Sequence, residues 1–138
     1  MEVLVRYLSK LGHTKDIAFA IATALDTNAI SITDEKELKT HADILFLGGA
    51  PYANIMDPKL KEYAKNLKKE NVGIVVLFTT SNWSRRTIYA LRKILNNNGI
   101  KVYEDYFYAH MLNIENRIPK AMEFAKNVKE KIYDNLWF

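Results

Sequence analysis

Short apolar runs alternate along this chain with longer segments in which apolar residues recur every three to four positions. Five runs have the apolar and β-branched residues of buried strands, at residues 3–8, 29–32, 44–48, 73–79 and 101–107. Four segments have the helical period, at residues 14–25, 58–69, 84–98 and 118–136. Such alternation predicts right-handed crossovers and a parallel sheet that helices cover on both faces.

The length of the chain suits one such sheet. It has 138 residues, and single domains typically hold about 100–200. We therefore expect residues 1–138 to form a single α/β domain, a three-layer α/β/α sandwich around a five-stranded parallel sheet. The polar segment at residues 34–41, between the second and third predicted strands, is expected to hold at most a short helical turn.

The composition excludes several kinds of site and location. There is no cysteine, which excludes disulfides, zinc–thiolate centres and thiol nucleophiles. The longest apolar stretch, residues 72–78, is far shorter than the roughly 18 residues that a membrane helix needs. The first residues also lack the pattern of a signal peptide. We therefore expect a cytoplasmic protein that does not bind a membrane.

The net charge of +4 is unevenly distributed. Residues 1–57 hold eight acids and five bases, whereas residues 58–138 hold eight acids and fifteen bases. Five of these bases lie between residues 84 and 101, a stretch without an acid: Arg85, Arg86, Arg92, Lys93 and Lys101. The asymmetry indicates either a docking face for an anionic partner or simply a solvated basic helix surface.

The site of an open parallel sheet is expected in the loops at the carboxyl ends of its strands, here residues 9–14, 49–57, 79–84 and 108–114. The first of these loops runs directly into a helix. Backbone N–H groups at a helix N-terminus form an anion site, Ser9 and Thr14 add hydroxyl donors, and Gly12 permits close backbone approach. The loop is neither a Walker loop nor a dinucleotide fingerprint. The alternative is a plain strand–helix turn with a threonine cap.

Three segments together resemble the flavodoxin family. The strand–Ser9-x-x-Gly12-x-Thr14–helix segment is similar to that family's phosphate loop for flavin mononucleotide (FMN). Residues 43–52 look like its third strand and the loop beside the flavin ring, and residues 77–83 look like its fourth strand and second flavin loop. The resemblance covers essentially the whole chain. It implies the strand order 2-1-3-4-5.

The resemblance implies an FMN site of three groups of residues, with no catalytic residue and no metal ligand. The phosphate loop comprises Ser9, Lys10, Leu11, Gly12, His13 and Thr14. The loop beside the ring contributes Ala50, Pro51, Tyr52, Ala53 and Asn54. The pyrimidine edge would meet Thr79, Thr80, Ser81, Asn82 and Trp83.

Several of these side chains have two possible roles. Tyr52 either stacks on the ring or packs at the surface, and Trp83 is either a second stacking partner or a lid. Arg85 and Arg86 either reach the flavin or stay solvated. The chain departs from the family in two respects: Leu11 stands where many flavodoxins have a hydroxyl residue, and flavodoxins that carry electrons are typically acidic.

The first functional hypothesis is an FMN-binding redox protein that transfers electrons to or from a redox partner protein, for which an acidic protein is one option. The alternative is a flavin-dependent oxidoreductase of the quinone reductase or protoporphyrinogen oxidase type. A non-redox binding module of the same fold is a further possibility. A receiver domain needs an aspartate where this chain has Gly48 and Gly49, and no nucleic-acid-binding motif is present, so no nucleic-acid partner is expected.

Overall fold

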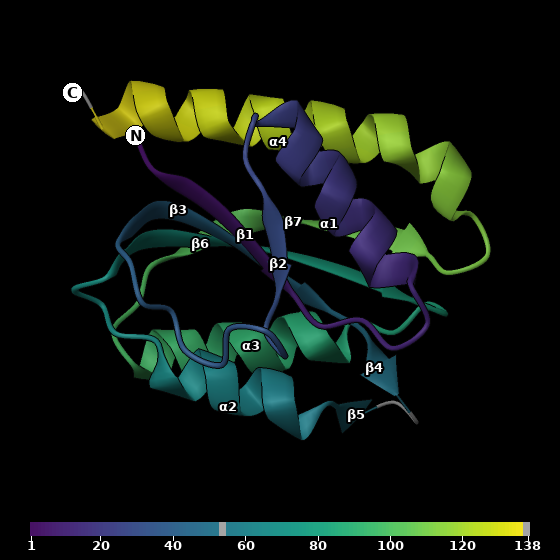
Figure 1. Cartoon of the computed structure of the whole chain (residues 1–138), viewed down its shortest axis with the longest axis horizontal. Helices are drawn as coiled ribbons and strands as arrows, with labels where there is room; N and C mark the ends of the chain where they lie inside the picture. The colour runs from purple at the N-terminus through teal and green to yellow at the C-terminus, as the bar shows by residue number, and fades with distance from the viewer. Residues whose placement is uncertain (53–54, 137–138) are drawn as a thin grey trace.

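A five-stranded parallel sheet forms the centre of the chain (Figure 1). The computed structural model describes residues 1–52 and 55–136. The strands of the sheet are β1 (Val3–Tyr7), β2 (Ala29–Ser31), β3 (Ala42–Gly49), β6 (Val72–Ser81) and β7 (Val102–His110). They lie in the order β2-β1-β3-β6-β7, and each neighbouring pair is parallel. This is the topology that the order 2-1-3-4-5 describes, so the predicted fold class is confirmed.

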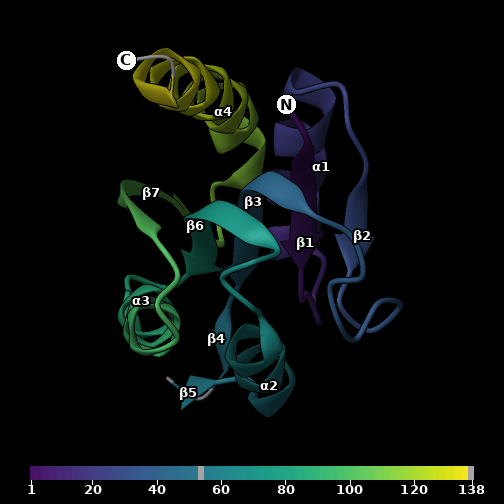
Figure 2. The same cartoon turned by 90° about the vertical axis from the view of Figure 1, so that its left-hand side faces the viewer.

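Two helices cover each face of the sheet (Figures 1 and 2). The helices α1 (His13–Ala24) and α4 (Ile114–Leu136) pack on one face, and α2 (Pro58–Asn66) and α3 (Arg86–Asn97) pack on the other. Each face of the sheet contributes alternate strand residues to its own apolar core, as the period of a strand requires. The predicted three-layer sandwich is therefore present, and no described helix is long and apolar enough to cross a membrane.

Three strands are longer than the sequence predicts: β3 spans residues 42–49 instead of 44–48, and β6 and β7 gain longer extensions at their carboxyl ends. β6 continues to Ser81 and β7 to His110, because the two extensions pair with each other in the register Thr79 with Tyr108 and Ser81 with His110. Residues expected in the third and fourth loops therefore lie in strands. Helix α4 begins at residue 114 rather than 118, and Pro119 lies inside it, although proline is typical of the first helical position.

A short hairpin interrupts the loop after β3. Its strands, β4 (Pro51–Tyr52) and β5 (Ile55–Met56), pair antiparallel. The sequence predicts only a loop here, because two-residue strands are too short to show a period. Immediately before the hairpin, a Cβ on Gly48 would overlap the Phe78 ring, so this end of β3 needs glycine for close packing.

An ion pair between a buried arginine and a partly buried glutamate holds the long connection between β2 and β3. Arg6 on β1 is 4% exposed, and its Nε and Nη2 donate to the two carboxylate oxygens of Glu35 at 2.9 and 3.2 Å. Nη1 donates to the Val5 carbonyl at 3.0 Å. Residues 32–41 form turns and bends without a helix, as the polar sequence predicts. The Arg6–Glu35 pair therefore anchors a segment that has no helix to pack against the sheet.

Candidate functional site

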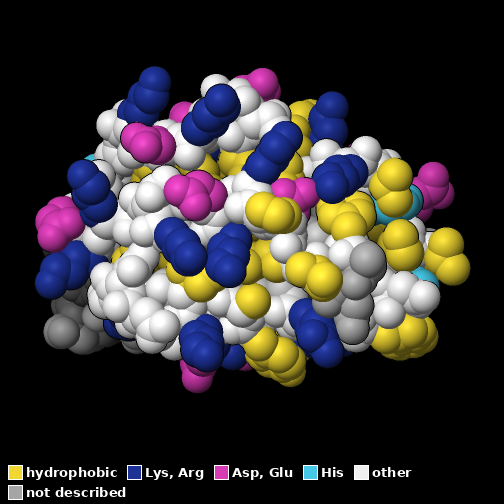
Figure 3. Space-filling model, turned by 90° about the horizontal axis from the view of Figure 1, so that it is seen from below, with side chains coloured by type: hydrophobic (Ala, Val, Ile, Leu, Met, Phe, Trp, Pro, Cys, Tyr) yellow, Lys and Arg dark blue, Asp and Glu magenta, His cyan; other side chains and the backbone are white. Residues whose placement is uncertain are grey.

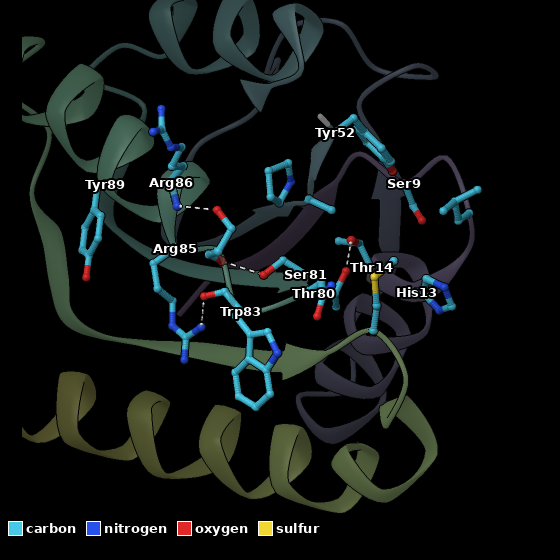
Figure 4. A pocket seen from close by; sticks show the side chains of 16 residues that line it. Ser9, His13, Thr14, Tyr52, Thr80, Ser81, Trp83, Arg85, Arg86 and Tyr89 are labelled. Atoms are coloured by element: carbon cyan, nitrogen blue, oxygen red, sulfur yellow. Dashed lines mark hydrogen bonds between the residues drawn. The ribbon is translucent and has the colours of Figure 1, made fainter. Parts of the chain in front are cut away.

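A cavity of about 700 Å³ opens at the carboxyl ends of β1, β3 and β6 (Figure 4). Eleven of the sixteen residues predicted to bind the cofactor line it: Ser9, Leu11, His13, Thr14, Ala50, Pro51, Tyr52, Thr80, Ser81, Asn82 and Trp83. Figure 4 shows Ser9, His13 and Tyr52 on one side and Arg86 and Tyr89 on the other. The volume lies within the range of about 300–1,000 Å³ that is usual for small-molecule sites.

Three of the described predicted residues do not line the cavity, and two more, Ala53 and Asn54, lie outside the described residues. Thr79 is fully buried, and its hydroxyl donates to the Gly49 carbonyl at 2.7 Å, because β6 continues past this position and places it between strands. The other two, Lys10 and Gly12, contact residues that do line it: the Lys10 N–H donates to the Tyr52 hydroxyl, and the Gly12 N–H donates to the Ser9 hydroxyl.

Helix α1 begins at the cavity with its first backbone amides available. Gly12 precedes the helix with a φ of 94°, in the left-handed region that favours glycine. Its N–H donates to the Ser9 hydroxyl at 3.0 Å, which folds the loop back toward the helix. Within the described part of the chain, no side chain caps α1. The unsatisfied first-turn amides and the helix dipole favour an anion at this end of the cavity.

Two buried hydroxyls face each other beside this helix start. The Thr14 and Thr80 Oγ1 atoms are 2.7 Å apart, and both residues are 1% exposed. Each hydroxyl carries one proton, but the bond between them uses only one. The second proton can therefore be donated to a third group. Because both residues line the cavity, an anionic oxygen bound there is a suitable acceptor.

Tyr52 is held against the first loop. Its hydroxyl accepts a hydrogen bond from the Lys10 backbone N–H at 2.8 Å, and the Lys10 Nζ lies 4.6 Å from the ring centroid. The same Nζ forms an ion pair with Asp57 Oδ2 at 3.1 Å. The Lys10 ammonium is thus engaged by Asp57 and Tyr52, and this residue links the loop after β1 to the loop after β3.

The surroundings of the Asp57 carboxyl favour its ionised form. Burial tends to raise its pKa, but the Lys59 backbone N–H, which donates to Oδ1 at 2.8 Å, and the Lys10 ammonium outweigh burial, so the pKa lies below its ordinary value. Because the pKa of Asp57 is lower in the folded protein than in the unfolded chain, its ionised carboxylate stabilises the fold. This stabilisation is complete at pH values above the pKa of the unfolded chain, and it is lost as the pH falls through the pKa of the folded protein.

Asp57→Asn is therefore expected to destabilise the protein by about 1 kcal/mol at neutral pH. The difference from wild type should begin to shrink near the ordinary aspartate pKa of about 4 and should vanish only once the pH has fallen below the lowered folded-state pKa. Asparagine keeps the acceptor for the Lys59 N–H but loses the ion pair. Urea unfolding at several pH values measures the effect. In a Lys10→Met background the same substitution should cost less, and a cost that does not depend on pH would contradict the role of the carboxylate.

The loop after β6 is fixed onto β7 by a tyrosine and an arginine. Trp83 has a φ of 74°, and its N–H donates to the Tyr108 hydroxyl at 2.9 Å, which in turn donates to the Ser81 carbonyl at 3.1 Å. The Arg85 guanidinium lies 3.4 Å from the Tyr108 ring centroid and donates to the Trp83 carbonyl at 2.9 Å. A left-handed conformation in a non-glycine residue persists only where the surroundings hold it.

His110 orients the polar side chain at the tip of this loop. The Leu112 N–H donates to His110 Nδ1 at 3.1 Å, so in the neutral ring the proton is on Nε2. Nε2 then donates to Asn82 Oδ1, 2.9 Å away, which leaves the Asn82 amide nitrogen as a donor for other groups. The His110 ring also packs edge-to-face against Trp83, with centroids 4.8 Å apart.

The structure adds residues to the predicted site. Arg85 and Arg86, whose roles the sequence leaves open, both line the cavity. Met111, from the segment 108–114 in which part of the site was expected, also lines it, as does Tyr89, which the sequence does not predict. Tyr89 lies three residues after Arg86 on α3, so the helical period could have identified it. Met111 follows β7, which ends three residues later than predicted.

The fold can be compared with solved structures. The chain matches no protein-family model and no curated protein. It is similar to oxidised flavodoxin 1 from Bacillus cereus, with 14% identity and a TM-score of 0.72 over 91% of this chain and 95% of that one. A flavodoxin from the domain Archaea is 19% identical, with a TM-score of 0.69 over 96% of this chain and 99% of that one.

A longer protein contains a stretch of similar fold. The rubredoxin oxygen:oxidoreductase from Desulfovibrio gigas is 18% identical and has a TM-score of 0.67, over 95% of this chain and 37% of that one. These similarities establish that the chain has a flavodoxin-like fold.

Proposed function

We propose that the protein binds FMN non-covalently in the cavity and carries electrons to or from a redox partner protein. The observation that carries this proposal is the Thr14–Thr80 hydroxyl pair beside the uncapped start of α1, inside a cavity of cofactor size. Such a donor set suits a phosphate monoester. The structures that share the fold include proteins named flavodoxins, which supports a flavin as the ligand.

The phosphate would be bound by the loop after β1. The first-turn amides of α1 and the hydroxyl proton left over from the Thr14–Thr80 pair provide donors without a buried cation. Lys10 would contribute its position rather than its charge, because Asp57 already neutralises the ammonium. The left-handed Gly12 lets the backbone turn toward the anion.

The flavin ring would lie between the loops after β3 and β6. Tyr52 offers an aromatic face whose orientation the Lys10 N–H fixes, and aromatic pairs contribute about 0.5–1.5 kcal/mol beyond area burial. The Asn82 amide nitrogen, freed by the bond between Oδ1 and His110, can donate to a ring carbonyl. The bound flavin supplies the redox chemistry; these residues bind and orient it and limit the access of water.

The protein as isolated is expected to be yellow, or to quench the fluorescence of added FMN at micromolar concentration. Thr14→Val should weaken FMN binding about tenfold or more, because a hydrogen bond to a charged group contributes about 1.5–3 kcal/mol. Riboflavin, which has no phosphate, should bind both proteins equally. A fluorescence titration with each ligand measures these affinities.

The matched control is Thr87→Val on α3. Thr87 is fully buried outside the cavity, and its hydroxyl has no hydrogen-bond partner among the described residues, so its loss should change neither affinity. A colourless protein that does not quench FMN would overturn the proposal. Reduction of the bound flavin by NADH or NADPH alone would instead indicate an oxidoreductase.

A further inference from the structure

The two faces of the sandwich differ in charge. On one face, residues 58–70, which contain α2 and the following loop, have five lysines and two glutamates, and α3 has three bases and no acid. These two segments, which we call the basic face, together hold eight bases and two acids, a net charge of +6. On the opposite face, α1 and α4 together hold six bases and five acids, a net charge of +1.

The charges of the basic face point into solvent. All five lysines of residues 58–70 are exposed, as are Arg86 and Lys93 on α3. Figure 3 shows dark blue side chains spread over this face, with apolar side chains gathered toward the end where Figure 1 places β4 and β5. The basic surface and an apolar surface are therefore adjacent.

Large apolar side chains surround the mouth of the cavity at this end. Leu11, Trp83 and Tyr89 line the cavity and are 66%, 72% and 60% exposed, and Leu112, next to the lining residue Met111, is 88% exposed. These four exposed residues form an apolar rim. Tyr89 and Arg86 belong both to the cavity wall and to α3, so the apolar rim continues directly into the basic face.

We propose that an acidic redox protein docks with its apolar contact surface on the apolar rim and its carboxylates on the basic face. Protein interfaces combine an apolar centre rich in Trp and Tyr with a charged periphery, and this surface has both parts. Opposite charges accelerate encounter and fix orientation. Docking on the rim would bring the partner's redox centre to the mouth of the cavity. This part of the proposal rests on the proposed binding of FMN in the cavity.

An extended polyanion fits the surface less well. Nucleic acids bind mainly through many phosphate contacts to cations, which the basic face alone would satisfy. The apolar rim would then remain exposed, and the cavity would have no part in the complex. An acidic partner that exchanges electrons at the cavity accounts both for the charge of the basic face and for the position of the apolar rim.

The proposal can be tested by electron transfer from a reduced acidic [2Fe–2S] ferredoxin to the FMN-loaded protein, followed as bleaching of the flavin absorption in a stopped-flow instrument. The iron–sulfur protein is oxidised and the flavin is reduced. The rate should fall at least about tenfold as salt rises from about 0.01 M to about 0.5 M, because screening removes the attraction between the proteins. Electron transfer from the reduced flavoprotein to a basic c-type cytochrome should instead speed up with salt.

Two double variants with equal charge change separate the faces. Lys61→Glu with Lys93→Glu alters the basic face, whereas Lys126→Glu with Lys131→Glu alters exposed positions on α4. At low salt the first should slow transfer from the ferredoxin about tenfold, and the second should stay within about twofold of wild type. All three proteins should bind FMN equally, because none of these lysines lines the cavity.

The outcomes distinguish the two proposals. A protein that fails to bind FMN contradicts the proposed function before any rate is measured. Normal FMN binding with a salt-independent rate, or with equal rates in the two double variants, overturns the docking surface alone. A third outcome would also overturn the docking surface. If the protein is retained on heparin at physiological salt, only the basic-face variant loses this retention, and the ferredoxin rates are unchanged, the occupant is a polyanion.

Discussion

Gly12→Asp is expected to bind FMN about 100-fold more weakly than Gly12→Asn, while both variants bind riboflavin with the same affinity. The substitution places a carboxylate at the N-terminus of α1, next to the proposed position of the phosphate. Two like charges about 5–6 Å apart repel by a few kcal/mol at the effective dielectric constant of a protein surface. Titration of each ligand by fluorescence quenching gives the ratio.

Asparagine is the matched control because it separates charge from backbone strain. The φ of Gly12 is 94°, where a side chain costs about 1–2 kcal/mol, but Asn and Asp both tolerate left-handed conformations better than other residues. Open space surrounds the position of a Cβ on Gly12, so neither side chain should clash. Equal losses of FMN affinity in the two variants would place the phosphate elsewhere.

The order of elements could be predicted because it depends on local patterns. β3 and β6 are buried on both faces and read as nearly continuous apolar runs, and α2 has a start signal in Asp57, whose side chain accepts from the Lys59 N–H. The ends of β6 and β7 could not be predicted, because each extension exists through pairing with the other. The local pattern of one strand does not show which distant residues it pairs with.

The meeting of the loops at one cavity followed from topology, but the contacts between them did not. A parallel sheet brings the loops after its strands to one edge, so the loops containing Ser9, Tyr52 and Trp83 were expected to meet. The bonds that hold them join distant residues: Thr14 pairs with Thr80, 66 positions away, and the Lys10 N–H with Tyr52, 42 positions away. Lys10 gains contacts that its place in the sequence does not predict: its ammonium pairs with Asp57, and its backbone N–H holds Tyr52.

The Arg6–Glu35 pair is a similar long-range contact with a large expected effect on stability. Glu35→Gln should lower the free energy of unfolding by about 3 kcal/mol, because it leaves the 4%-exposed Arg6 guanidinium without its carboxylate. The midpoint of urea unfolding should fall while its slope stays unchanged. FMN binding should persist wherever the variant is folded, because neither residue lines the cavity.

Two further variants establish whether burial of the charge causes this loss. Glu37→Gln removes an exposed carboxylate from the same connection and should change stability by less than about 0.5 kcal/mol. Adding Arg6→Met to Glu35→Gln should recover part of the loss, since replacing both members of a buried pair is less costly than removing one. If Glu35→Gln and Glu37→Gln unfold at the same urea concentration, the ion pair does not hold the connection between β2 and β3, and the apolar contact of Ile32 in the core would have to do so.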